Sequence, residues 1–480
     1  DAAGWGKDRK LYIEAGINYD RAFGSHHISA LALYNQSKYW SPSLAYLVPN
    51  AYQGIVGRVT YEYASRYLFE FDMGYNGTEN FAVGHRFGFF PAVSAGWILT
   101  EEDWLPDNEI LTYMKIRARY GEVGNDKIGG ARFLYLPTSY SESWEELYKY
   151  RFGVSYNPTE SNAMIEGKMG NPDLTWERAR KTNLGLDFNM FKGRLSIQSD
   201  VFYEYRDNIL ANRSTVPDIV GADLPAYNLG VMENYGFEFD GTWRHSVREF
   251  SYWLRGNLSF ARNRIVSMDE VDKKFAYQAA TGRRNGQFFG LIFDGYYNSW
   301  EEINALDRPV SAWSSNQLQP GDCRYVDVNK DGRIDEYDYV PIGYSNIPEI
   351  VYGISFGFSW KGFDFSMLFQ GASNVSIQYN GRALWPFING TESAKAYILD
   401  RWTPERYAAG EDIHFPRLSI NPSGHNYKPS TLWTRDADYL RLKNMEIGYS
   451  LSKKTVRKMR IGGLRLFFNG SNLLTFTDVI

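Results

Sequence analysis

The feature that most constrains this chain is a hydrophobic period of two residues, sustained over long segments. In 195–208 the apolar positions are Leu195, Ile197, Val201, Tyr203 and Tyr205, and the polar ones are Gln198, Asp200, Glu204 and Arg206. Successive side chains of a strand point to opposite faces, so such a segment has one apolar face and one polar face. Segment 66–75 repeats the pattern, and so do 11–20, 234–243 and 250–260.

We count about 14 such strands, each near or above the roughly 9–11 residues that cross a membrane at a tilt. The predicted strands are 11–23, 27–40, 51–62, 66–76, 86–99, 110–124, 182–191, 195–210, 233–246, 250–268, 350–360, 364–378, 438–451 and 463–476.

The connections between these strands alternate in length. Short ones fall at 24–26, 64–65, 192–194, 246–249 and 361–363, with two intermediate ones at 100–109 and 452–462 in the same phase. Long ones occupy 125–181, 211–232, 269–349 and 379–437. Short periplasmic turns and long extracellular loops are typical of outer-membrane barrels. A run of soluble β-sandwiches explains the alternation, but neither this asymmetry nor acidic residues along one face of such long strands. The sequence therefore predicts an all-β fold, a transmembrane antiparallel β-barrel with long extracellular loops.

Composition agrees with a barrel. Aromatic residues make up 17% of the chain, yet mean hydropathy is only −0.44, as expected when only alternate strand residues face lipid. The net charge of −4 gives no reason to expect a nucleic-acid partner. The single cysteine, Cys323, excludes an internal disulfide, and we expect it to be inert. No stretch approaches the roughly 18–20 apolar residues of a transmembrane helix.

The phase of the turns predicts an incomplete wall. If short turns are periplasmic, both ends of this sequence are extracellular, whereas single-chain bacterial barrels normally have periplasmic ends. We therefore expect at least one strand before Leu11 and one after Ile480. The opening DAAGWGKDRK is not a signal peptide, so the exported protein is expected to begin elsewhere.

The sharpest motif in the loops is DVNKDGRIDEYD, 327–338. It matches the Asp-x-Asn-x-Asp-Gly opening of a calcium loop, in which alternate oxygen ligands converge around a glycine turn. The predicted ligands are Asp327, Asn329, Asp331, the carbonyl of Arg333, Asp335 and Asp338. The last position is Asp rather than Glu, which weakens the expectation of bidentate binding. The alternative is a solvated acidic turn. Without strongly helical flanks, a bound Ca²⁺ would be structural rather than part of a sensor.

Other loop features are less specific. Exposed aromatic side chains can stack on sugar rings, but they serve loop packing equally well, and packing is the favoured interpretation for any single one. The candidates are Trp144, Trp300, Trp313 and Trp385. Lys453 and Lys454, with the KMR triplet at 458–460, make a basic periplasmic turn that we interpret as solvated.

Catalytic signatures are missing from the sequence. It contains no HExxH, GxSxG or GK[ST] motif, and its six histidines have no ligand spacing. We therefore expect no enzyme.

Two successive segments, RFGFFPAVSAGWILTEEDWL (86–105) and MKIRARYGEVGND (114–126), resemble hallmarks of the SusC/RagA family, the TonB-dependent transporters of Bacteroidetes. Five further segments follow in the family's order, at 171–188, 228–243, 320–343, 439–451 and 466–477. Seven ordered segments over most of the chain are more specific than any single motif. The calcium-like loop also lies where the family carries one.

The resemblance implies a closed, plugged barrel of about 22 strands, of which residues 1–480 are a part without the plug and closing strands. Residues 320–343 would be a calcium-loop insertion in an extracellular loop. It also implies an outer-membrane importer with a SusD-like surface lipoprotein as a lid, driven by the TonB complex through the N-terminal region that this sequence lacks. Oligosaccharides are the leading substrate and oligopeptides, as in RagA, the alternative.

Residues of the polar face would line the transport path: Glu70, Asp72, Asp200, Glu204 and Glu238. A second hypothesis is a calcium-stabilised surface-binding or adhesion protein without transport. A third is a barrel hydrolase, which lacks an identifiable nucleophile and base.

Overall fold

The fold is given by a computed structural model. It describes residues 7–42, 44, 48–106, 108–128, 132–137, 140–142, 149–154, 157–165, 167–216, 224–313, 318–381, 384–387, 393–419 and 424–479.

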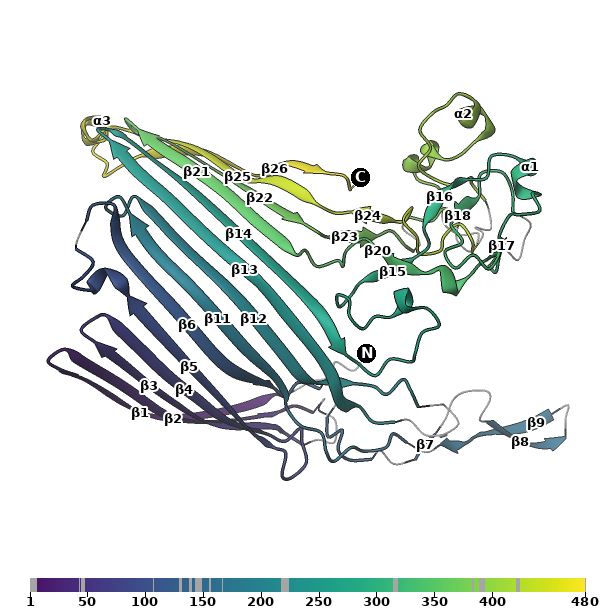
Figure 1. Cartoon of the computed structure of the whole chain (residues 1–480), viewed down its shortest axis with the longest axis horizontal. Coiled ribbons are helices and arrows are strands. Elements are labelled where there is room, and N and C mark those ends of the chain that lie inside the picture. The colour runs from purple at the N-terminus through teal and green to yellow at the C-terminus, as the bar shows by residue number, and fades with distance from the viewer. Residues whose placement is uncertain are drawn as a thin grey trace. The chain divides into compact units, whose positions relative to one another are not determined.

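Fourteen long strands form one antiparallel sheet and follow one another in chain order (Figure 1). They are β1 (Arg9–Phe23), β2 (His26–Trp40), β3 (Asn50–Tyr63), β4 (Tyr67–Thr78), β5 (Phe87–Ile98), β6 (Leu111–Asn125), β11 (Glu177–Met190), β12 (Leu195–Ala211), β13 (Tyr227–Val247), β14 (Phe250–Ser267), β21 (Ile350–Trp360), β22 (Phe363–Ser373), β25 (Tyr439–Ser450) and β26 (Arg465–Thr477). All fourteen predicted strands are confirmed.

Three predicted boundaries were wrong by several residues. Strand β11 begins at Glu177 rather than 182, and β13 begins at Tyr227 rather than 233. Arg178 and Arg180 stand where the alternation would place apolar side chains, so the pattern hides the start of β11. Strand β22 ends at Ser373, because 376–378 form β23 (Ser376–Gln378), which pairs with β24 (Thr434–Asp436) in a separate sheet.

The short connections are tight turns with left-handed backbone. Ala64 and Ser65 have φ of 51° and 56°, and Lys361 and Gly362 have φ of 49° and 90°. Two successive positive φ values match the twist of the flanking strands in a two-residue hairpin. At Gly362 a Cβ would lie 2.6 Å from the carbonyl oxygen of Ser450, so this turn also leaves no room for a side chain.

The chain divides into two compact units, Asp1–Gly241 with Asn263–Val271, and Thr242–Arg262 with Asp272–Ile480. Within the first unit, pairing register keeps each row of side chains on one face. Tyr61 pairs with Phe69, Phe69 with Ala95, and Ala95 with Ala118. The neighbouring row is polar and aligns Thr60, Glu70, Ser94 and Arg119. The predicted alternation is therefore a property of the whole wall in this unit.

The second unit has the same two faces. Leu254 pairs with Phe356, Phe356 with Met367, and Met367 with Met445, which gives a continuous apolar row. The adjacent row carries Arg255, Ser355, Leu368 and Asn444, with Arg255 opposite Ser355 and Leu368 opposite both Ser355 and Asn444.

The long loops of the second unit fold around their own core. It contains Leu291, Tyr296, Cys323, Tyr325, Ile334, Ile398, Trp402, Phe415, Leu432 and Trp433. Short strands surround this core: β15 (Phe288–Gly290), β16 (Phe293–Tyr296), β17 (Val310–Ser311), β18 (Cys323–Tyr325), β19 (Arg333–Ile334) and β20 (Val340–Ile342). The described residues of 272–349 and 374–438 thus form one packed layer, which we call the loop cap.

The remaining short elements are β7 (Ser141–Glu142), β8 (Lys149–Val154), β9 (Asn157–Asn162), β10 (Met164–Ile165), α1 (Trp300–Ile303), α2 (Pro404–Ala408) and α3 (Lys453–Lys458). Among the residues that the structure places, no helix is both long and apolar enough to cross a membrane.

The register predicts opposite outcomes for a charge at two adjacent positions of β21. Ile354 belongs to the apolar face and is 50% exposed, whereas Ser355 lies on the polar face. Because arginine facing lipid near the bilayer midplane costs about 2–4 kcal/mol, Ile354→Arg should destabilise the folded protein by about that amount. The matched change Ser355→Arg should cost less than about 1 kcal/mol. Urea titration of the protein in lipid vesicles measures both, and equal losses would contradict the register.

Candidate functional site

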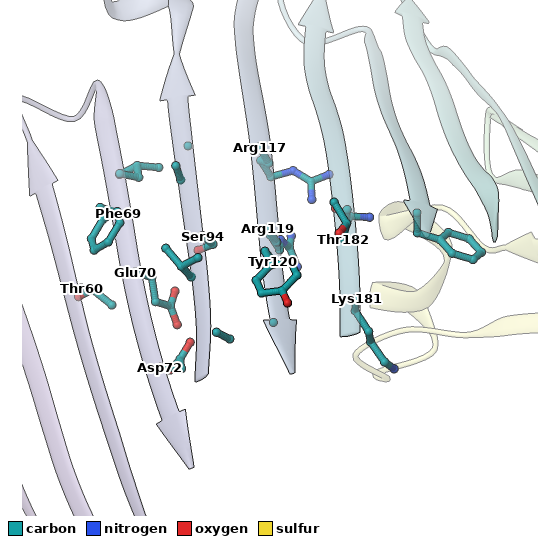
Figure 2. A pocket seen from close by; sticks show the side chains of 18 of the residues that line it. Thr60, Phe69, Glu70, Asp72, Ser94, Arg117, Arg119, Tyr120, Lys181 and Thr182 are labelled. Carbon is teal, nitrogen blue, oxygen red and sulfur yellow. The ribbon is translucent and has the colours of Figure 1, made fainter. Parts of the chain in front are cut away.

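The polar face of the first unit carries an open cavity of about 920 Å³. Its lining comes from β2 to β6 and β11 to β13 and includes Glu204 and Glu238. Figure 2 shows further lining residues: Thr60, Glu70, Asp72, Ser94, Arg117, Arg119 and Lys181. We call this surface the charged face. It is the concentration of ionisable side chains that the strand alternation places on one side of the wall.

Arg117 lies at the centre of a buried ion-pair group on this face. Its Nε donates to Asp187 Oδ2 at 2.7 Å and its Nη2 donates to Asp200 Oδ2 at 3.0 Å. The Arg117 side chain is 9% exposed, and Asp187 and Asp200 are 24% and 15% exposed. One guanidinium therefore bridges two carboxylates, in the fork geometry that arginine favours.

Gly185 makes this bridge possible. It is paired with Arg117 on β6 and with Asp200 on β12, so it stands between the two charges. A Cβ at Gly185 would lie 2.6 Å from the Arg117 guanidinium carbon. Because Gly185 has no side chain, the Arg117 guanidinium can cross β11 and reach Asp200 on β12.

Other charges on the same face are also paired. Arg58 Nε lies 3.0 Å from Glu70 Oε1 and 2.8 Å from Asp72 Oδ1. Glu204 accepts from Arg206 Nη2 at 2.7 Å and lies 3.2 Å from the Lys181 ammonium. In contrast, Arg119 forms no ion pair with any residue that the structure describes, although it lies near Glu70 in the cavity (Figure 2).

The five acidic positions predicted for the polar face do lie together. Glu70, Asp72, Glu204 and Glu238 line the cavity, and Asp200 is bonded to the cavity residue Arg117. The cations that pair with them, above all Arg117 and Arg58, were not predicted from the sequence. Each partner comes from another strand, so only the pairing register could have shown the match.

The calcium-like loop is closed by its own side chains. Asp327 Oδ2 accepts from the Gly332 N–H at 2.8 Å, and Asn329 Oδ1 accepts from the Asp331 N–H at 2.9 Å. Asp331 Oδ1 accepts from the Arg333 N–H at 3.0 Å. Gly332 has a φ of 78°, which supplies the turn expected at that position.

The second half of this loop is more buried. Asp338 is fully buried, and its two carboxylate oxygens accept from the Val328 and Asp335 N–H groups at 2.8 and 2.9 Å. Burial raises the pKa of Asp338. Within the described ranges, no three His, Cys, Asp or Glu side chains are grouped so that they could hold a metal. A cation here would need Asn329 and the Arg333 carbonyl as further ligands, so the calcium site stays a prediction.

The predicted aromatic residues have different surroundings. Trp313 stacks on Tyr339 with ring centres 5.9 Å apart, and Trp385 lies 5.1 Å from Tyr427. Both tryptophans pack against the core of the loop cap. Trp300 is 46% exposed at the start of α1, and Trp144 lies outside the described residues. Packing accounts for Trp313 and Trp385. Of the three candidate tryptophans whose positions are described, only Trp300 has an exposed ring.

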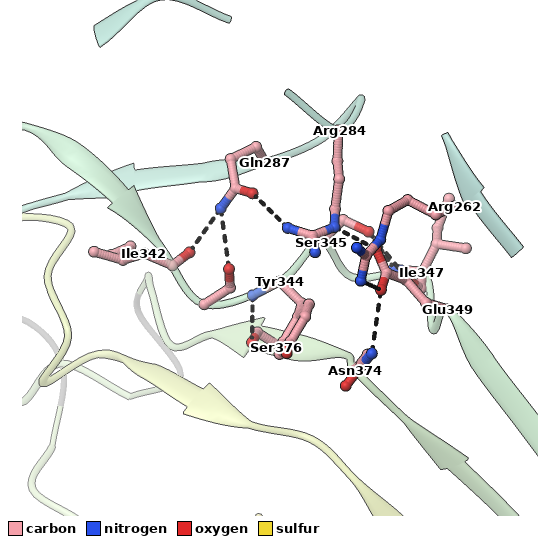
Figure 3. Close-up of polar contacts among 11 residues, drawn as sticks. Arg262, Arg284, Gln287, Ile342, Tyr344, Ser345, Ile347, Glu349, Asn374 and Ser376 are labelled. Carbon is pink, nitrogen blue, oxygen red and sulfur yellow. Dashed lines mark hydrogen bonds and ion pairs between the residues drawn. The ribbon is translucent and has the colours of Figure 1, made fainter. Parts of the chain in front are cut away.

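A buried carboxylate fixes the loop cap to the strands of its own unit (Figure 3). Glu349, 6% exposed, accepts from Arg262 Nη2 of β14 at 2.7 Å and from Asn374 Nδ2 after β22 at 3.2 Å. It also pairs with Arg284 of the loop cap. Burial alone would raise the pKa of Glu349, but the two guanidinium groups outweigh it and lower the pKa.

Removing the Arg117 guanidinium should strongly destabilise the first unit, because it leaves Asp187 and Asp200 facing each other without a cation. Breaking a buried pair costs about 3–5 kcal/mol. The two carboxylates are partly exposed, so we expect about 2–3 kcal/mol for Arg117→Met. The matched variant Arg119→Met removes an unpaired guanidinium from the same strand and face and should change stability by less than about 1 kcal/mol. Denaturant unfolding in detergent measures the difference, and equal effects would contradict the central role of Arg117.

Comparison with known proteins agrees with this geometry. Residues 3–473 match the family described as TonB dependent receptor-like, beta-barrel. TonB-dependent receptor P3 of Formosa agariphila is 26% identical, with 96% of this chain and 47% of that protein covered. TonB-dependent receptor SusC of Bacteroides thetaiotaomicron is 28% identical, with 87% of this chain and 40% of that protein covered.

The fold also resembles a solved structure, that of the RagAB peptide transporter. The TM-score is 0.74 at 19% identity, covering 98% of this chain and 52% of that one. The chain thus spans about half the length of the relatives it matches. These relatives are named as receptors or transporters. The family match over nearly all of the sequence shows that the chain belongs to the TonB-dependent receptor β-barrels of the outer membrane.

Proposed function

We propose that this chain forms part of the barrel wall of a SusC-like importer, which takes up oligosaccharides across the outer membrane. The observation that carries the proposal is the charged face, a polar cavity lined by strands whose opposite face is apolar. Such a wall separates lipid from a hydrophilic path. A SusD-like surface lipoprotein would cover the loops, and the TonB complex would supply the energy.

The charge pattern supports a neutral, hydroxyl-rich cargo. Arg117, Arg58 and Lys181 are each compensated by carboxylates on the same face. These pairs still offer oxygen and nitrogen atoms for hydrogen bonds, and each pair presents little net charge to a solute. Sugars need such bonds and carry no charge of their own, whereas a peptide brings charged termini that compete with the existing pairs.

Peptide import is the alternative. The RagAB relative is described as a peptide transporter, but at 19% identity that likeness supports the fold alone. The family match favours import of either kind over the adhesion hypothesis, because the relatives of this chain are named as TonB-dependent receptors.

Uptake is tested in a strain from which the full-length protein has been deleted. Growth on defined oligosaccharides as the only carbon source should require the protein, and growth on defined oligopeptides should not. A TonB-deficient strain is the control and should fail on the same glycans. Rescue on peptides alone would replace the glycan proposal with the alternative, and unchanged growth on every substrate would contradict import.

We also propose that the loop 327–338 binds a structural Ca²⁺. The supporting observation is the closeness of the carboxylates along one turn. Asp338 Oδ1 accepts from the Val328 N–H at 2.8 Å, directly after Asp327, and Asp327 accepts from the Asp331 and Gly332 N–H groups at 3.3 and 2.8 Å. The only cation in contact is Arg333, whose Nε is 3.9 Å from Asp335 Oδ2, among the residues with described positions. Hard oxygen ligands with excess negative charge suit Ca²⁺.

The calcium proposal predicts a loss of ion-dependent protection. In Asp327→Ala with Asp331→Ala, added Ca²⁺ should no longer slow proteolytic cleavage within 320–343, because two ligands are gone. The matched control is Asp272→Ala with Asp307→Ala, which removes the same charge outside the loop. Cleavage is followed by mass spectrometry with Ca²⁺ or a chelator. Protection that survives in the first variant would refute the site.

A further inference from the structure

One short connection differs in chemistry from the others of its unit. Helix α3 lies between β25 and β26, at the end of the strands where the β21–β22 turn also lies (Figure 1). The Ser450 N–H donates to the Gly362 carbonyl at 2.7 Å, and the Leu451 N–H donates to Leu464 at 2.9 Å. The segment 452–461, which we call the basic turn, is therefore held at the short-turn end. In bacterial barrels this end is periplasmic.

The basic turn carries uncompensated positive charge. Its cations are exposed: Lys453, Lys454, Arg457, Lys458 and Arg460. The segment contains no Asp or Glu. None of these cations makes an ion pair with a residue whose position is described. By comparison, Lys361 in the neighbouring turn lies 3.9 Å from Glu249.

Helix stability explains only part of this arrangement, because the dipole favours Arg457 and Lys458 in the last turn of α3. Lys453 and Lys454 occupy the first turn of α3, where the helix dipole disfavours cations and no acidic residue offsets them. Lys453 and Arg457 are four residues apart, so like charges repel along the helix. At roughly 100° per residue, the four cations of α3 cover a sector of about 140°. Buried Val456 lies outside that sector and packs inward.

Exposed apolar side chains accompany the cations. Met459 and Ile461 are 51% and 41% exposed. Phe363 is paired with Trp360 and Tyr449, which gives an aromatic row at this end of the apolar face. Aromatic rows mark the membrane interface in barrels, and cations beside exposed apolar groups suit a lipid surface.

We propose that the basic turn binds the headgroups of anionic phospholipids in the periplasmic leaflet of the outer membrane. The cations would contact lipid phosphates, while Met459 and Ile461 would enter the acyl boundary. The apolar pair favours lipid over a free phosphate ion or a cell-wall polymer, neither of which offers an apolar partner. This proposal replaces the sequence-based interpretation of the segment as a solvated turn. The proposal does not depend on the transported substrate.

The test uses native mass spectrometry of the full-length protein in detergent, titrated with phosphatidylglycerol or phosphatidylcholine. Wild-type protein should bind phosphatidylglycerol more tightly. The variant Lys453→Gln, Lys454→Gln, Lys458→Gln should lose at least about fivefold in that preference, the effect of one basic residue near an anionic surface. The matched control Lys273→Gln, Lys274→Gln, Lys395→Gln removes the same charge from the loop cap and should keep the preference.

Several outcomes would overturn the proposal. They are equal affinity of the wild type for the two lipids, retained preference in the basic-turn variant, and equal loss in both variants. Displacement of the lipid by inorganic phosphate would show a general anion site instead. Binding of purified peptidoglycan without lipid preference would assign the turn to the cell wall. The wild-type lipid comparison and the phosphate competition need no variant, so they decide the matter even if the triple change prevents folding.

Discussion

The structure depends on strand pairing in a register that keeps every second side chain on the same face. Backbone N–H and C=O groups of the strands from β2 to β25 are satisfied by a neighbour on each side, which is a requirement for any segment that crosses lipid. A shift of one residue would move Glu70 and Asp72 to the apolar side and Phe69 and Phe71 to the polar side. Correct register therefore sets both the outer surface of the wall and the chemistry of the inner one.

The charged face follows from that register. Arg117, Asp187 and Asp200 come from three strands, and they meet because Gly185 leaves space between them. The loop cap is positioned in a similar way by Glu349, a buried carboxylate that joins Arg262 of a strand to Arg284 of a loop. In both places one charged side chain forms ion pairs with two partners and so connects segments that are far apart in the sequence.

Local pattern was sufficient to predict all fourteen strands, because each strand has its own alternation. It failed where charge replaced hydrophobicity on the outer face, as at Arg178 and Arg180 at the start of β11. It also could not pair Arg58 with Asp72, because that contact arises only when β3 and β4 are aligned. The calcium motif predicted a tight acidic turn, and the loop forms one, whereas the bound ion stays a prediction. The sequence could not show whether Trp313 and Trp385 pack in the protein or are free to stack on a ligand. In the structure both pack against the core of the loop cap.

The central claim is that alternate residues of these strands face lipid. It is tested most directly by nitroxide scanning of consecutive positions in β21, from Ile354 to Ser359, in the full-length protein in vesicles. The account predicts high collision rates with oxygen at Ile354, Phe356 and Phe358, because oxygen concentrates in the acyl region. It predicts low rates at Ser355, Gly357 and Ser359. A flat profile, or one with the opposite phase, would contradict the assignment of the two faces.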